Sequence, residues 1–286
     1  MTISTYRTAL ITGASAGMGA EFAEALAAAG SNLVLVARRK EKLDVLAARL
    51  AERHDVTVEI LQADLEKDED LKRVEGRIAA EKTLDLLINN AGFGSPGPFS
   101  KTGVEPYLAM IRVHAAAPVR LTRAALDGMV LRRRGWIINV ASIAAFSPLS
   151  GPVYSATKAF LVSFSQNLQY ELEGTGVRIQ ALCPGLTHTD FHEVIRMDIS
   201  GLPGFLWMSA RAVVRTSLRA LGRRKVVCIP GLRNRLITAP MRCAPTAALL
   251  RWVAGLPYFR NKVGSDRLLA TGPPAPPARA GGSSSG

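Results

Sequence analysis

Cysteine is scarce in this sequence, with three residues in 286. So few cysteines exclude a disulfide scaffold and suit a reducing compartment. The first residues, MTISTYRTALITG, lack the basic start and long apolar run of a signal peptide. The most apolar late stretch, residues 236–258, is broken by arginines and prolines, so we expect no membrane span there. These absences predict a cytoplasmic protein, with attachment to a membrane surface left open.

Acidic residues are scarce in the last third of the chain. The whole sequence carries 36 Lys and Arg against 23 Asp and Glu, which gives a net charge of +13. Residues 1–189 account for +2 of this charge and residues 190–286 for +11. No nucleic-acid-binding motif accompanies the basic residues, so we expect no nucleic acid partner. The hydrophobic content of 48% excludes a disordered chain and permits a sizeable core.

Short apolar runs alternate with longer amphipathic segments along most of the chain. We predict seven strands, at 8–12, 32–37, 56–63, 84–90, 136–142, 177–184 and 226–231. We predict helices between them, from a Gly-rich turn through Ala29, near 40–54, near 66–81, near 104–134 and at 154–174. Strands that are apolar throughout are typical of a parallel sheet buried on both faces. The alternation then predicts a doubly wound α/β fold with right-handed crossovers.

We expect one domain over residues 1–265, because the sequence shows no internal linker and no repeat. Within this domain, a segment at about 186–210 is expected to form a lid over the substrate. A segment at about 232–262 is expected to form an amphipathic C-terminal extension. Residues 266–286 are expected to be a disordered tail, since the end of the chain is rich in Pro, Gly and Ser.

The motif TGASAGMG, residues 12–19, lies between the first predicted strand and helix. Glycine at the second position permits a tight turn, the next glycine lets backbone approach a diphosphate, and the last allows close helix packing. The helix amino terminus then presents free N–H groups to phosphates. The motif therefore predicts a dinucleotide-binding turn with contacts from Gly13, Ser15, Gly17, Met18 and Gly19.

The second strand ends in Ala37-Arg38-Arg39-Lys40, where dinucleotide folds that use NAD place an acidic residue. An arginine suits the 2′-phosphate of NADP instead, through its planar pair of N–H donors. Arg38 and Arg39 therefore favour NADPH. Asp64, at the end of the third strand, can accept from an adenine amino group or cap the following helix, and the sequence leaves both roles open.

Two loops at strand ends complete the expected cofactor cleft. The first is Asn89-Asn90-Ala91-Gly92, whose amides can hold the turn and the neighbouring backbone. The second is PGLTHT, residues 184–189, whose hydroxyls and backbone can meet a nicotinamide carboxamide. The contacts expected from these loops come from Asn90, Ala91, Gly92, Pro184, Gly185, Thr187 and Thr189.

Ser142 follows the fifth predicted strand, and Tyr154 and Lys158 lie four residues apart on the next helix. Side chains at that spacing share one face of a helix. A lysine ammonium beside a phenol favours the phenolate, so we expect the pKa of Tyr154 to fall below its free value of about 10. Tyr154 can then protonate a carbonyl oxygen that Ser142 orients, as hydride reaches the carbon.

In order and spacing, TGASAGMG, NNAG, Ser142, YSATK and PGLTHT together resemble the short-chain dehydrogenase/reductase family, over roughly residues 5–230. The resemblance implies a Rossmann-type doubly wound parallel sheet with helices on both faces and a nicotinamide cofactor. It implies Ser142, Tyr154 and Lys158 as catalytic residues, and contacts from Tyr154 and Lys158 to the cofactor. The arginines after the second strand are similar to those of members that use NADPH/NADP+. The family usually assembles through its two long helices, so the resemblance also implies a homodimer or tetramer.

One position departs from the family pattern. His114 stands in the long helix where members usually carry an Asn that holds a water of the proton relay. A neutral His can also donate at one ring nitrogen and accept at the other. It is bulkier, however, and is expected to titrate near neutrality. Two interpretations stay open: His114 replaces the relay as a fourth catalytic residue, or the enzyme is slow or altered.

The segment expected to cover the substrate is rich in large apolar side chains. They are Phe191, Ile195, Met197, Leu202, Phe205, Leu206, Trp207 and Met208. They would form an adaptable lid, with bending points at Gly201 and Gly204, although a packed helix pair would use the same residues. We expect a hydrophobic ketone or aldehyde as substrate, such as a 3-oxoacyl thioester or a steroid-like ketone.

After the seventh strand, arginines alternate with apolar residues, at 233, 235, 242, 251 and 260. Three interpretations stay open for this extension. It is a docked helix with a solvated Arg face, a patch for peripheral contact with anionic membrane, or a site for acyl-CoA phosphate or an acidic acyl carrier.

The residues together predict an NADPH-dependent oxidoreductase that reduces a hydrophobic ketone or aldehyde to an alcohol. We expect no metal site. The alternative function, motivated by His114, is a catalytically weak NADPH-binding sensor or scaffold protein.

Overall fold

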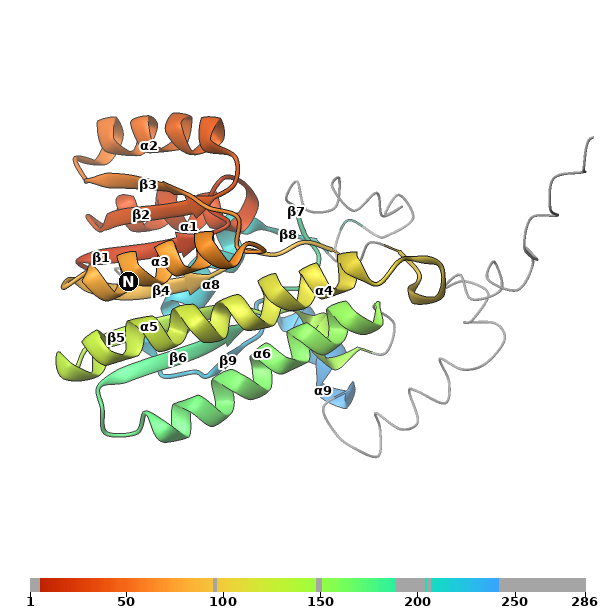
Figure 1. The fold of residues 1–286 in the computed structure, drawn as a ribbon. Coiled ribbons are helices and arrows are strands. Elements are labelled where there is room, and N and C mark those ends of the chain that lie inside the picture. The colour runs from red at the N-terminus through yellow and green to blue at the C-terminus, as the bar shows by residue number, and fades with distance from the viewer. Residues whose placement is uncertain (1–5, 95–96, 148–150, 189–203, 205–206, 242–286) are drawn as a thin grey trace, which may run out of the picture.

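A computed structural model describes residues 6–94, 97–147, 151–188, 204 and 207–241. Its centre is a seven-stranded parallel sheet in the order β3-β2-β1-β4-β5-β6-β9 (Figure 1). The strands are β1 Thr8–Thr12, β2 Asn32–Ala37, β3 Val58–Gln62, β4 Leu84–Asn89, β5 Gly135–Val140, β6 Val177–Leu182 and β9 Val227–Cys228. The predicted parallel sheet of about seven strands is confirmed.

Helices cover both faces of this sheet. The α-helices of the described residues are α1 Gly17–Ala27, α2 Lys40–His54, α3 Asp68–Ala80, α4 Glu105–Ile111, α5 Ala117–Leu131, α6 Pro152–Glu171, α8 Ala210–Gly222 and α9 Leu232–Met241. Short 3-10 turns lie at η1 Phe99–Lys101 and η3 Ile143–Phe146. A π-helical segment, η2 Arg112–Ala116, joins α4 to α5.

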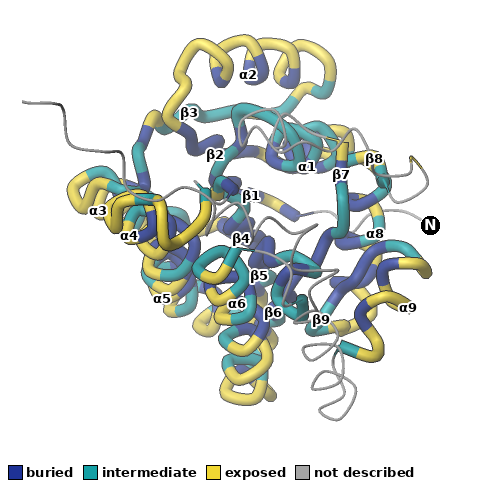
Figure 2. Tube along the Cα trace, turned by 90° about the vertical axis from the view of Figure 1, so that its right-hand side faces the viewer, coloured by how far each residue is buried: buried dark blue, intermediate teal, exposed yellow. Residues whose placement is uncertain are grey.

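The strands are apolar on both sides because each side of the sheet has its own core. Phe22 of α1, Leu46 of α2 and Val214 of α8 pack in one core cluster. Val74 of α3 and Leu121 of α5 pack in the other, against which α6 also lies. Figure 2 shows buried central strands and a partly buried β3, with helices around the sheet whose outer sides are exposed. The doubly wound arrangement is therefore confirmed.

The long helix predicted near 104–134 is found as α4, η2 and α5, which follow one another without a break, but it is not α-helical throughout. At the end of the π segment, the N–H of Ala117 donates to the carbonyl of Arg112, five residues back. Pro118 follows directly and has no N–H with which to continue an α-helical ladder. The proline thus accounts for a widened turn at this point, and His114 lies inside it.

The seventh strand is shorter than the predicted 226–231. Pro230 lacks a ladder donor, and Gly231 turns the chain with a φ of 83°. The expected extension at 232–262 begins as α9, whereas its residues 242–262 and the expected tail at 266–286 lie outside the described residues. In the part of the chain that the structure describes, no helix combines the length and apolarity needed to cross a membrane.

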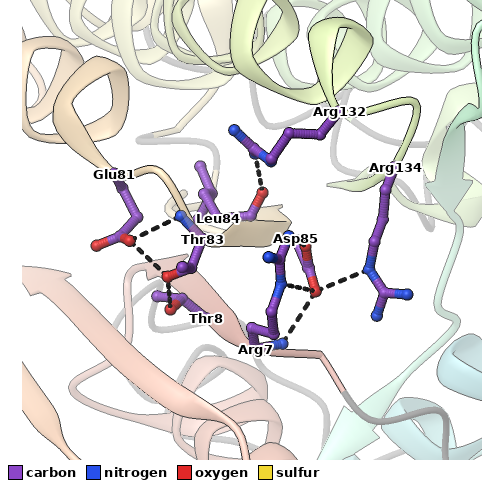
Figure 3. A network of polar contacts seen from close by, with 8 residues as sticks. All are labelled: Arg7, Thr8, Glu81, Thr83, Leu84, Asp85, Arg132 and Arg134. Carbon is purple, nitrogen blue, oxygen red and sulfur yellow. Dashed lines mark hydrogen bonds and ion pairs between the residues drawn. The ribbon is translucent and has the colours of Figure 1, made fainter.

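A buried carboxylate joins the central strands at their amino ends, opposite the edge that carries the Gly-rich turn. Asp85 of β4 accepts hydrogen bonds from the main-chain and side-chain nitrogens of Arg7, at 2.8–3.2 Å (Figure 3). It also accepts one from Nε of Arg134, just before β5, at 3.0 Å. The Arg134 guanidinium lies 5.1 Å from the ring centre of Trp136, which packs edge-on to Tyr6. One side chain therefore links the starts of β1, β4 and β5.

Candidate active site

The turn after β1 has the backbone shape of a diphosphate-binding loop. Gly13 and Gly17 adopt φ angles of 67° and 55°, which strain any residue with a side chain. A Cβ on Gly19 would collide with the carbonyl of Gly13, so α1 approaches β1 closely only because position 19 lacks one. The N-cap residue, Ala16, makes no side-chain cap, which leaves the first N–H groups of α1 open to a ligand. The residues present thus fit the diphosphate of a dinucleotide.

Asn90 holds this turn against the end of β4. Its Nδ2 donates to the carbonyls of Thr12 and Gly13, at 2.9 and 3.2 Å. The hydroxyl of Thr12 in turn accepts from the main-chain nitrogens of Asn90 and Ala91, each at 3.0 Å. Asn89 points elsewhere and donates to Asn139 within the core. The structure therefore brings the NNAG loop and the Gly-rich turn together, as the sequence predicted.

The two arginines after β2 are not equivalent. Nε and Nη2 of Arg39 donate to the hydroxyl of Ser15 in the Gly-rich turn, at 3.2 and 3.0 Å. Arg38 instead lies 3.6 Å from the carboxylate of Glu66. Arg39 is therefore the cation held beside the expected diphosphate site.

One of the two roles predicted for Asp64 is not found. Its Oδ1 accepts from the N–H of Glu66 at 3.2 Å, inside the turn that precedes α3. The N-cap of α3 is Lys67, so the interpretation of Asp64 as a cap for this helix is wrong. An adenine contact for Asp64 stays a prediction.

Ser142, Tyr154 and Lys158 converge at the carboxyl edge of β5. The hydroxyl of Ser142 accepts from the N–H of Ala144 at 3.1 Å and hydrogen-bonds the Tyr154 side chain. The Lys158 ammonium lies 5.7 Å from the centre of the Tyr154 ring and donates to the carbonyl of Val140 at 2.9 Å. The last bond fixes the lysine of α6 to the end of the strand that carries Ser142.

Burial dominates the ionisation of this group. It raises the pKa of Tyr154 to about 12, and the hydrogen bond from Ser142 acts in the opposite direction without outweighing it. The expected fall in the pKa of Tyr154 is therefore not found. Burial also lowers the pKa of Lys158 to about 8, with a small opposing effect of Cys183. The cost of removing a charge from water is therefore the largest cause of both pKa shifts.

His114 is almost fully buried, and both of its ring nitrogens are engaged. Nε2 accepts from the N–H of Phe93 at 2.9 Å. Nδ1 lies 3.3 Å from the hydroxyl of Thr157, which donates to the carbonyl of Tyr154 at 2.9 Å. Since Nε2 accepts and the threonine proton is used elsewhere, the hydrogen-bond network places the imidazole proton on Nδ1. His114 therefore joins the loop after β4 to the backbone of α6.

The pKa of His114 lies well below its usual value, because burial and the nearby Lys158 charge both disfavour the imidazolium. The expected titration of His114 near neutrality is therefore wrong. Gly92 leaves room for the ring, since a Cβ there would come within 2.9 Å of Nε2. Thr157, inside the YSATK motif, is a partner that sequence reasoning missed.

The loop after β6 lies beside this site. The carbonyl of Pro184 accepts from the N–H of Ile143 at 2.9 Å, and the Thr187 hydroxyl donates to the carbonyl of Gly185 at 2.9 Å. A Cβ on Gly185 would collide with Asn234 of α9. Asn234 is a second missed neighbour, because nothing in its local sequence indicates that α9 folds back onto this loop.

Of the expected lid at 186–210, the structure describes residues 186–188, 204 and 207–210. Thr187–His188 forms β7 and Met208–Ser209 forms β8, which pair as a two-stranded parallel sheet. The rings of His188 and Trp207 stack at 4.8 Å between centres. Thr189 and the expected lid residues at 191, 195, 197, 202, 205 and 206 lie outside the described residues.

Comparisons with known proteins agree with this geometry. Residues 7–200 match the short chain dehydrogenase family. A very-long-chain 3-oxoacyl-CoA reductase from Phaeosphaeria nodorum is 36% identical over 222 residues, which are 75% of this chain. The chain spans 63% of the length of that relative.

Two solved structures are similar over 96% of this chain. A short-chain dehydrogenase from Sphingobium yanoikuyae in complex with NADPH is 35% identical, with a TM-score of 0.76 over 99% of its chain. A bulky-bulky ketone specific alcohol dehydrogenase from Comamonas testosteroni is 34% identical, with a TM-score of 0.73 over 98% of its chain. The expected Rossmann-type fold is confirmed.

Proposed function

Because this chain belongs to the short-chain dehydrogenase family, we propose that it reduces a hydrophobic ketone or aldehyde to an alcohol with NADPH. Family membership makes it an oxidoreductase that acts on CH–OH or C=O groups with a nicotinamide cofactor. The observation that carries the proposal is the convergence of Ser142, Tyr154 and Lys158 at one strand end. Bound NADPH would supply the hydride.

In the proposed reaction, Tyr154 gives its proton to the substrate carbonyl oxygen, which Ser142 also contacts. The high pKa of Tyr154 keeps the phenol protonated until a carbonyl with developing negative charge accepts the proton. Lys158, with a pKa of about 8, is largely protonated at neutral pH. Its ammonium, near the Tyr154 ring, stabilises the phenolate that the proton transfer leaves in a buried site.

The preference for NADPH is proposed from Arg39, which Ser15 holds beside the Gly-rich turn. We expect Arg39→Gln to raise KM for NADPH roughly 10–100-fold, because a charge-assisted hydrogen bond to the 2′-phosphate contributes about 1.5–3 kcal/mol. KM for NADH should change little. Steady-state kinetics with both cofactors measures this, with Arg38→Gln as the matched control of smaller effect. Equal losses with both cofactors would contradict a 2′-phosphate contact.

The proposed substrate is a hydrophobic ketone or aldehyde, 3-oxoacyl or steroid-like. The names of the Phaeosphaeria and Comamonas proteins, a 3-oxoacyl-CoA reductase and a bulky-bulky ketone dehydrogenase, support this class. The test is NADPH oxidation with a panel of 3-oxoacyl thioesters, bulky ketones, steroids and aromatic aldehydes. We expect turnover of at least one hydrophobic carbonyl class. Tight NADPH binding without turnover of any would favour the alternative, a catalytically weak sensor or scaffold.

We propose His114 as a positioning residue at the place of the usual Asn. We expect His114→Asn to retain or raise turnover, because an amide also offers one donor and one acceptor and is smaller. The pH profile of kcat near neutrality should not change, since burial and the Lys158 charge hold the pKa of His114 well below its usual value. His114→Leu, which cannot accept from Phe93, should lower kcat. An unchanged fold with abolished activity in His114→Asn would contradict the proposal that an amide can replace the imidazole at this position.

A homodimer or tetramer is part of the proposal. The exposed apolar side chains Leu108, Val119 and Phe160, on α4, α5 and α6, support an interface along these helices. The rings of Phe160 and Phe164 stack there at 5.8 Å between centres. Such a row of exposed apolar groups is typical of a surface that another copy covers.

A further inference from the structure

A pocket of about 330 Å³ lies between the second half of α8, the edge strand β9 and α9. Strand β9 is the edge strand of the sheet, next to β6 (Figure 1). Because Val227 and Cys228 of β9 line the pocket, it lies at this edge. Four basic side chains line it, Arg219, Arg223, Lys225 and Arg235. None of its lining residues is acidic. None of them belongs to the Gly-rich turn or to the group of Ser142, Tyr154 and Lys158. The pocket is therefore distinct from the proposed active site.

The described chain segment that forms most of this pocket is rich in basic residues and has no acidic ones. Described residues 207–241 include eight Lys and Arg and no Asp or Glu. Arg120 of α5, by contrast, contacts two carboxylates of α3. Among the residues that the structure describes, no carboxylate lies within ion-pair distance of Arg219, Lys225 or Arg235. Like charges held close together repel one another. An anion bound in the pocket would therefore reduce this repulsion.

Two of the guanidinium groups are held in place. Nε of Arg235 donates to the carbonyl of Ile229 at 2.9 Å, and Nε of Arg219 donates to a carbonyl of the preceding helical turn at 3.1 Å. In the described part of the chain, their terminal Nη atoms have no protein acceptor. Burial raises the pKa of the Cys228 thiol in the pocket wall to about 11, and nearby Arg235 and Lys225 act against this rise. Cations from α8, α9 and the intervening segment thus face one space.

We propose that this pocket binds a phosphate ester. Guanidinium groups present paired N–H donors that match phosphate oxygens. A phosphate or diphosphate also brings more negative charge and more acceptor oxygens than a carboxylate, which suits a cavity with several cations. The site does not depend on the proposed reaction.

The phosphate group could belong to either of two kinds of ligand, a soluble phosphate ester or a phospholipid headgroup. A soluble ester includes the nucleotide part of a coenzyme A thioester. The lipid source would gain an apolar contact from Leu232, Leu236 and Ile237, which are exposed on α9 next to Arg235. The experiment therefore has an arm for each source.

The primary probe is inorganic pyrophosphate, titrated by calorimetry into the protein loaded with NADP+ so that the cofactor cleft is filled. We expect one binding event that weakens roughly tenfold or more in Arg219→Gln/Lys225→Gln, which removes two charge-assisted contacts. The matched control, Arg211→Gln/Arg215→Gln, removes the same charge from the same chain segment outside the lining. It should weaken binding by less than about twofold. All four side chains are exposed, so both variants are expected to fold.

Absence of any binding event, or equal weakening in the two double variants, would overturn the proposal in favour of a diffuse positive field. Coenzyme A binding that is lost in Arg219→Gln/Lys225→Gln supports a soluble ester. Co-sedimentation with phosphatidylglycerol vesicles, lost both in that variant and in Leu232→Ser/Leu236→Ser, supports a headgroup. If the Arg219→Gln/Lys225→Gln variant binds the vesicles as well as the parent protein does, this result counts against the pocket as a phosphate site.

Discussion

Tyr154→Phe is expected to lower kcat for carbonyl reduction by roughly 10²–10⁴-fold, the usual contribution of a positioned general acid. The phenylalanine keeps the ring that packs against His114 and lies near Lys158, and removes only the hydroxyl bonded to Ser142. The fold and the affinity for NADPH should therefore stay near those of the parent protein. Steady-state kinetics with the best substrate of the panel, together with NADPH fluorescence titration, measures both quantities.

Tyr170→Phe is the matched control for this variant. Tyr170 lies on the same helix, α6, but its side chain is exposed, and the same hydroxyl is lost. We expect its kcat to equal that of the parent protein. If Tyr154→Phe kept its turnover while Tyr170→Phe behaved as expected, the proton would have to come from another group, and the assigned role of Tyr154 would fail.

Asp85→Ala is expected to cause the largest loss of stability among the polar changes considered. The variant removes a fully buried carboxylate and leaves Arg7, Arg134 and the N–H of Arg7 without their acceptor. We expect a loss of about 3 kcal/mol in the free energy of unfolding, the lower end of the range for breaking a buried ion pair. The lower end applies because both arginines are about half exposed, at 49% and 44%, and regain water. Denaturant unfolding measures this loss.

Asp127→Ala serves as the control, because Asp127 is 76% exposed and pairs with Arg123 at the surface. Its cost should stay below about 1 kcal/mol. A loss for Asp85→Ala no larger than that of the control would show that the network of Figure 3 contributes little to the joining of the central strands.

The contribution of Asp85 should also depend on pH. Burial alone would raise the pKa of this carboxyl, but the hydrogen bonds from Arg7 and Arg134 outweigh it and hold the pKa below its usual value. Because the folded pKa is depressed, the stabilisation is present above the unfolded pKa of about 3.9 and is lost as the pH falls through the folded value. The stability difference between the parent protein and Asp85→Asn should therefore narrow below about pH 4.

Much of the fold was predictable because its signals are local. The apolar runs at 8–12 and 32–37 match β1 and β2 residue for residue, and the helix predicted near 40–54 matches α2. Periodicity and turn chemistry act over a few residues, so sequence windows contain them. The short β9 was predicted too long because Val226 to Gly231 reads as an apolar run, although Pro230 and Gly231 end the ladder.

The residues of the candidate site could be predicted from the sequence, whereas their hydrogen-bond partners and pKa shifts could not. The sequence does not distinguish Arg38 from Arg39, whereas in the structure Arg39 donates to Ser15 and Arg38 lies near Glu66. The spacing of Tyr154 and Lys158 predicts a lowered pKa for Tyr154, whereas burial raises that pKa. The direction of this pKa shift depends on how completely the neighbouring elements exclude water from Tyr154. The spacing of residues along one helix gives no information about that exclusion.

The sequence by itself determined the order of strands and helices, the Gly-rich turn and the four-residue spacing of Tyr154 and Lys158. Each of these is a property of adjacent residues. Only the tertiary structure decided that His114 stays neutral and joins Phe93 to Thr157, and that cations of α8 and α9 share one pocket. Phe93 lies 21 residues before His114, and Thr157 lies 43 residues after it. Burial and hydrogen-bond partners of this kind arise when distant segments pack together, so no local pattern specifies them.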